Sequence, residues 1–149
     1  MQGVIQGGIY VAVLFMLTFF SYTDIKNRTV PVPGIVIFSA AAFLSFVPGS
    51  GLTLLQAAGG ALTGLVFLVI SFLTKGEIGS GDGLVIALTG IYLGFWKNAE
   101  LLVCALFMCA IYSLVLVVVS RKSKRYEVPF VPFMLAGYVL MLGFGRMVL

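Results

Sequence analysis

Residues 76–83 read GEIGSGDG and lead directly into the apolar stretch LVIALTGIYLGFW at residues 84–96. The first stretch holds four glycines and two of the five carboxylates of the chain, Glu77 and Asp82. Long apolar segments lie on both sides of it. A charged boundary between such segments is typical of the place where a helix meets the surface of a membrane.

The composition supports a membrane protein. Of the 149 residues, 61% are hydrophobic and 9% are charged, whereas soluble domains average about 25% charged residues. We therefore predict an integral membrane protein with one membrane-embedded domain, residues 1–149. The net charge of +4 does not indicate nucleic-acid binding, because the basic residues cluster between the apolar segments, where membrane topology explains them.

The residue types present exclude several chemistries. Histidine is absent, which rules out Ser-His and Cys-His catalysis within the chain and histidine-containing metal sites. Cys104 and Cys109 lie five residues apart and match no zinc or redox motif. We interpret them as small hydrophobic residues that face lipid or the core. No metal and no cofactor is expected.

The apolar pattern predicts an all-α, polytopic membrane protein with about six transmembrane helices, because crossing the hydrocarbon core takes about 20 apolar residues. Gly60 and Gly64 have the small-xxx-small spacing that lets two helices approach closely. The six predicted segments cover residues 4–23, 33–47, 52–73, 83–96, 99–120 and 131–148.

The distribution of basic residues predicts the orientation. The loops after the first, third and fifth segments hold seven of them: Lys26, Arg28, Lys75, Arg121, Lys122, Lys124 and Arg125. The other side holds Lys97 and Arg146. By the positive-inside rule, the odd-numbered loops face the cytoplasm and both termini lie outside. Asp24 and Asp82 then lie at the same depth, at the cytoplasmic ends of the first and fourth segments.

Two aspartates at one depth suggest a specific chemistry. Ionisable groups at a membrane are costly, and they indicate function by default. Two adjacent carboxyl groups tend to share one proton, so one can activate a water while the other polarises a carbonyl. The partial charges of the helix ends favour Asp82 as the base and Asp24 as the acid. Structural explanations stay open: Asp82 can cap its helix, and Asp24 can be a polar flank of the first segment.

The glycines beside Asp82 fit the same hypothesis. Gly79, Gly81 and Gly83 permit unusual backbone angles and leave room for another backbone. An extended substrate segment could pair with such a loop through main-chain hydrogen bonds. We therefore expect these glycines, together with Glu77, to bind substrate. Glu77 could equally pair with Lys75.

Three stretches carry a resemblance to a known family: SYTDIKNRTVPVPGI at residues 21–35, GSGDGLVIALTGIYLGF at residues 79–95 and VPFVPFMLAGYVL at residues 128–140. In this order they resemble the type IV prepilin peptidases, membrane aspartyl proteases of the Gly-x-Gly-Asp type, and most closely the short Tad/Flp-type members. The resemblance implies Asp24 and Asp82 as catalytic residues, and Gly79 and Gly81 as the glycines of the second motif.

Further positions match the family, and some depart from it. Pro31 matches its first proline, and residues 129–133 match its late Pro-Phe-x-Pro-Phe motif. Leu84 stands where many members have lysine, and Val32 where many have asparagine. The N-terminal cytoplasmic loop that longer members use for methylation has no counterpart in the sequence, so methyltransferase activity is not expected.

The resemblance also implies the substrate and the location. The substrate would be a pilin-like precursor whose short basic leader is cut at the cytoplasmic face of the inner (plasma) membrane of a prokaryote. The lipid bilayer is the other expected partner, and no nucleic acid is expected.

Three other functions compete with this hypothesis. One is an inactive scaffold subunit for pilus assembly, against which the intact aspartates count. Ser71 and Lys75 lie four residues apart and could form a serine-lysine hydrolase, although a serine bonded to its own backbone and a helix-end lysine explain them as well. A small transporter or channel could use Asp24 and Asp82 as ion or proton sites. Such proteins usually place these groups near the middle of the bilayer.

Overall fold

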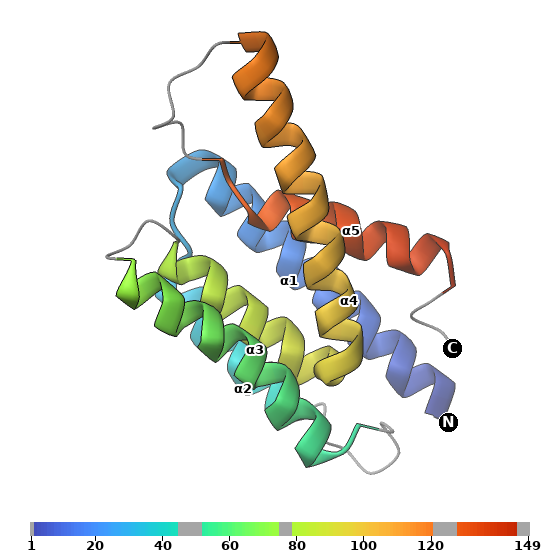
Figure 1. Cartoon of the computed structure of the whole chain (residues 1–149). Coiled ribbons are helices and arrows are strands. Elements are labelled where there is room, and N and C mark those ends of the chain that lie inside the picture. The colour runs from blue at the N-terminus through green and yellow to red at the C-terminus, as the bar shows by residue number, and fades with distance from the viewer. Residues whose placement is uncertain (1, 45–51, 75–78, 121–127, 146–149) are drawn as a thin grey trace.

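The computed structural model describes residues 2–44, 52–74, 79–120 and 128–145 (Figure 1). Helices make up nearly all of these residues, and no strand occurs among them. The elements are α1 (Gln2–Asn27), α2 (Val32–Leu44), α3 (Leu54–Leu73), α4 (Ser80–Ser120) and α5 (Val131–Gly143).

Helix α4 consists of two helical parts joined at Gly94. The backbone there has φ 75° and ψ 175°, a conformation that glycine adopts without the steric cost of a side chain. In Figure 1 the first part of α4 lies beside α3, and after the bend the second part runs in another direction, past α5. The fourth and fifth predicted segments are therefore the two parts of one bent element.

Three helices are long and apolar enough to cross a membrane: Gly3–Asn27, Leu54–Leu73 and the bent Ser80–Val118. Val32–Ala42 and Val131–Gly143 are shorter apolar helices. The all-helical membrane class is thus supported. The count of six spans and the placement of both termini outside stay predictions.

The first part of α4 packs on α3 through small residues. A methyl group added at Gly60 would collide with the backbone of Gly90, and one added at Gly64 would collide with Ala87. The two helices therefore approach each other at backbone distance, as the small-xxx-small spacing predicts.

Asn98 ties these packed segments together. Its side chain is fully buried, and its amide nitrogen donates to Thr63 Oγ1 at 2.7 Å, to the Ile86 carbonyl at 3.2 Å and to the Gly60 carbonyl at 3.4 Å. Its Oδ1 accepts from Thr89 Oγ1 at 2.7 Å. These bonds join α3 to both parts of α4, so they hold the bend at Gly94 in place.

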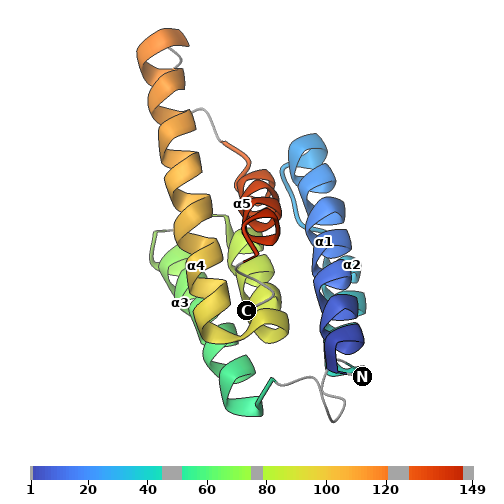
Figure 2. The same ribbon diagram turned by 90° about the vertical axis from the view of Figure 1, so that its right-hand side faces the viewer.

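Two tyrosines connect the remaining helices. The hydroxyl of Tyr138 in α5 donates to the carbonyl of Tyr10 in α1 at 2.9 Å. The hydroxyl of Tyr92 in α4 donates to the carbonyl of Phe38 in α2 at 2.7 Å. In Figure 2, α5 lies between α1 and the second part of α4. Each helix is thus joined to the bundle by a polar contact as well as by apolar packing.

The neighbouring glycines of α3 provide a test of this packing. Gly60→Ala should lower the free energy of unfolding in detergent by about 1–3 kcal/mol, because overpacking forces helices apart. Gly59→Ala should leave stability unchanged or slightly raise it, because a methyl group there would make ordinary contacts with the Phe95 side chain, the nearest to Cβ at 3.4 Å. Thermal unfolding of the two purified variants gives the comparison. Equal effects would contradict backbone contact at Gly60.

Candidate active site

Asp24 lies one turn before the end of α1. The helix ends because Arg28 adopts a left-handed conformation, φ 51°, and its N–H donates to the carbonyl of Asp24 at 2.9 Å, a common way to close a helix. Pro31 then accepts a bond from Ile35 at 3.3 Å at the start of α2. The side chain of Asp24 is 7% exposed, so this carboxyl group points into the protein.

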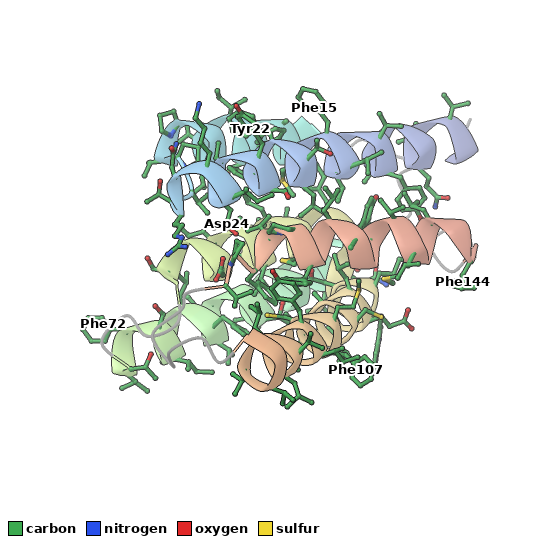
Figure 3. The ribbon with its side chains drawn as sticks, turned by 90° about the horizontal axis from the view of Figure 1, so that it is seen from above. Phe15, Tyr22, Asp24, Phe72, Phe107 and Phe144 are labelled. Atoms are coloured by element: carbon green, nitrogen blue, oxygen red, sulfur yellow. The ribbon has the colours of Figure 1, made fainter. Side chains whose placement is uncertain are left out.

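The carboxyl group of Asp24 caps another helix. Its Oδ2 accepts a hydrogen bond of 3.1 Å from the backbone N–H of Val131, in the first turn of α5. The first N–H groups of a helix have no partner within the helix, and the N-cap residue of α5, Phe130, provides no side-chain bond. In Figure 3, Asp24 lies between α1 and the first turn of α5. The segment at residues 129–133 therefore docks α5 onto Asp24.

Asp82 lies in the first turn of α4, which begins at Ser80, three residues before the predicted start. Its backbone N–H donates to the carbonyl of Gly79 at 3.1 Å. The side chain is half-buried and close enough to Asp24 for the two carboxyl groups to interact electrostatically. The structure thus brings together the two aspartates that the sequence placed at one depth.

The predicted substrate-binding glycines have different surroundings. A methyl group on Gly79 would lie 3.0 Å from Asp82 Oδ2, so this glycine leaves room for the carboxylate. Added methyl groups on Gly81 and Gly83 would lie 2.7 Å from Val30 Cγ2 and 2.9 Å from Leu68 Cγ. The space beside these two glycines is filled by packing in this structure. Their role in substrate binding stays a prediction.

Several predicted residues lie outside the described part of the chain. Glu77 belongs to residues 75–78, so both interpretations of it, substrate binding and pairing with Lys75, lie outside the described residues. Ser71 is buried at 4% exposure, and its proposed partner Lys75 is among the same undescribed residues.

Two further contacts at the site were not found from the sequence. Cys109, on the second part of α4, hydrogen-bonds with Ser113 and lies within electrostatic range of Asp82. Cys109 and Ser113 lie four residues apart, which puts both on one helix face. This spacing is the only sign of their contact in the sequence. The donor from Val131 is a backbone group, for which side-chain chemistry gives no signal.

The arrangement can support acid-base chemistry. Two carboxyl groups from separate helices lie within electrostatic range of each other, and one of them is held by a backbone donor. Among the described residues, no three histidine, cysteine, aspartate or glutamate side chains gather closely enough to hold a metal ion. The chemistry available at this place is that of a carboxyl pair.

Comparison with known proteins provides a family. Residues 11–114 match the sequence profile of the type IV leader peptidase family. A prepilin leader peptidase/N-methyltransferase of Bacillus subtilis (strain 168) is 31% identical over 144 residues, which cover 92% of this chain and 56% of that protein. The chain thus spans about half the length of this relative. No solved structure gives a significant match.

The capping bond of Asp24 can be separated from its charge. Asp24→Asn keeps a side-chain oxygen that can accept from Val131, so the free energy of unfolding should stay close to that of wild type. Asp24→Ala leaves the Val131 N–H unpaired, which should cost about 1–3 kcal/mol. Unfolding of both variants in detergent measures the difference. If Asp24→Ala were as stable as Asp24→Asn, the bond from Val131 to Asp24 would make no contribution to the stability of the protein.

Proposed function

Because the chain belongs to the type IV leader peptidase family, we propose that it is an aspartic endopeptidase that removes the short basic leader of pilin-like precursors. Asp24 and Asp82 form its catalytic pair. The observation that carries this proposal is that Asp24 at the end of α1 and Asp82 at the start of α4 lie within electrostatic range of each other. Membership in a peptidase family favours hydrolysis over ion transport for such a pair.

The reaction follows from what two carboxyl groups can do. The ionised carboxylate takes a proton from a water, whose oxygen bonds to the carbonyl carbon of the scissile peptide. The protonated partner donates its proton to the carbonyl oxygen. In the second step the carboxyl group that took the proton of the water donates it to the peptide nitrogen, and the C–N bond breaks. A hydroxyl proton of the tetrahedral intermediate returns to the other carboxylate as the new carboxyl group forms. The two aspartates end in a state that again shares one proton, so they act as a unit.

The structure supports a preorganised site for these steps. The bond from Val131 orients the Asp24 carboxyl group through Oδ2. Asp82 lies in the first turn of α4, half-buried and within electrostatic range of Asp24. Gly79 keeps the space beside Asp82 Oδ2 free of a side chain. Holding both groups on helix ends reduces the reorganisation needed during reaction.

The charge pattern supports the substrate and the face of the membrane. Carboxylates at the site favour a basic leader, and the basic loops favour a cytoplasmic position for this end of the bundle. The hydrophobic helix of the precursor would remain in the bilayer after cleavage. Glu77 could assist in holding the leader. The proposal concerns the peptidase activity alone.

Co-expression with a candidate precursor tests the catalytic pair. Wild type should convert the precursor to a product whose mass is lower by that of the leader. Asp24→Asn and Asp82→Asn preserve shape but cannot cycle a proton, so cleavage should fall by at least about 100-fold. Mass spectrometry of the product over time gives the rates.

Two matched variants complete this experiment. Glu100→Gln removes a carboxylate from an exposed position, and Ser71→Ala removes the hydroxyl of the competing serine-lysine site. Both should cleave at the wild-type rate. Normal cleavage by either aspartate variant would refute the pair, whereas loss of cleavage in Ser71→Ala alone would favour the serine hydrolase. If the protein were a transporter, neither wild type nor any of the variants would cleave the precursor.

A further inference from the structure

A cavity of about 260 Å³ lies at one end of the bundle. Its walls come from the N-terminal part of α1, the region where α3 begins, and the bend of α4. The polar residues that line it include Gln6, Tyr10, Gln56 and Lys97, and the apolar residues include Leu52 and Trp96. None of these residues belongs to the carboxyl pair described above.

The cavity lies at the opposite end of α1 from Asp24. Gln6 lines it and Asp24 follows 18 positions later in the same helix, which corresponds to about 27 Å at 1.5 Å per residue. The hydrocarbon core of a bilayer is about 30 Å thick. If the aspartates lie at one surface of the membrane, the cavity therefore lies at the other.

The polar wall of the cavity is positively charged. Lys97 Nζ donates to the hydroxyl of Tyr10 at 2.8 Å and lies 5.3 Å from the centre of its ring. Among the described residues that line the cavity, none is acidic. Gln56 uses its Oε1 to accept from the backbone of Thr53, so its amide N–H groups are the donors that it can offer. A cation beside amide donors is suited to a phosphate group.

The other wall is apolar and reaches the surface of the molecule. Trp96 is 76% exposed and precedes Lys97 directly, and tryptophan is enriched at the level of lipid headgroups. Pockets that enclose a whole drug-sized ligand measure roughly 300–1,000 Å³. The present cavity is smaller, so it fits a compact headgroup whose acyl chains stay outside, against the apolar surface.

We propose that this cavity binds the headgroup of an anionic phospholipid, with its phosphate at Lys97 and its acyl chains beside Trp96. A headgroup with its own ammonium would place a second cation beside Lys97, which selects phosphatidylglycerol over phosphatidylethanolamine. The apolar wall selects the lipid over free phosphate. This binding does not depend on the peptidase activity, since the two sites lie at opposite ends of α1.

Native mass spectrometry of the full chain in detergent tests the proposal. Phosphatidylglycerol should bind wild type about tenfold more tightly than phosphatidylethanolamine, a difference typical of one charge-assisted contact. Lys97→Gln should remove this preference and Lys97→Arg should keep it. Inorganic phosphate in tenfold excess over the lipid should not displace phosphatidylglycerol. Displacement by phosphate would overturn the assignment to a lipid.

The chain offers a matched control. Lys26 also lies over a tyrosine ring, 5.7 Å from the centre of Tyr22, but it is at the other end of α1 and lines no part of the cavity. Lys26→Gln should keep the preference. An equal loss in Lys26→Gln and Lys97→Gln would show a general charge effect and refute the site.

A second measurement needs no variant, in case Lys97→Gln does not fold. Phosphatidylglycerol with a photoactivatable headgroup should label wild type in peptides that contain Tyr10 or Trp96. Labelling confined to the end that carries Asp24 would refute the proposal, as would the absence of any lipid preference in wild type.

Discussion

The hydrogen bonds of Asn98 hold α3 and the two parts of α4 together, and the other helices depend on this packed unit. A bilayer offers no water to a buried polar group, so each such group must find a partner within the protein. The amide of Asn98 meets this requirement with Thr63 and the Gly60 carbonyl on α3, and with Thr89 and the Ile86 carbonyl on α4. Because Asn98 itself follows the bend at Gly94, these bonds fix the direction of the second part of α4 relative to the first.

The same requirement explains how the carboxyl pair is built. The first N–H groups of α5 need acceptors, and a buried carboxyl group needs donors. Asp24 and Val131 satisfy each other, so the residue proposed to carry the chemistry also positions a helix. A carboxyl group held in this way needs little reorganisation when the reaction begins.

Features that depend on short stretches of sequence could be predicted. Contacts between residues far apart in the chain could not. Apolar runs and the spacing of Gly60 and Gly64 are visible in short windows, because each depends on neighbouring residues alone. The shared depth of Asp24 and Asp82 was predicted from the alternation of basic residues between the loops. The stretch around Asn98 was interpreted as a loop between two segments, but its side chain is fully buried. Its partners on α3 lie 35 and 38 positions away, beyond what a local pattern can report.

The glycines near Asp82 are a second case in which a contact with a distant residue could not be predicted from the local sequence. Their spacing indicated space for a substrate, yet Gly81 contacts Val30 in the connection between α1 and α2. This contact matters for the pair, because α3 packs mainly on α4 whereas α1 packs mainly on α5. Asp24 and Asp82 therefore lie on helices that have little direct contact with each other, whereas α5 packs on both α1 and α4. Two contacts near the site bear on the spacing of the two aspartates. Val131 fixes Asp24 to α5, and Val30 fixes the chain just after α1 to the first turn of α4. The distance between the carboxyl groups thus depends on how α1, α4 and α5 pack together. That packing is a property of the whole bundle rather than of either aspartate motif.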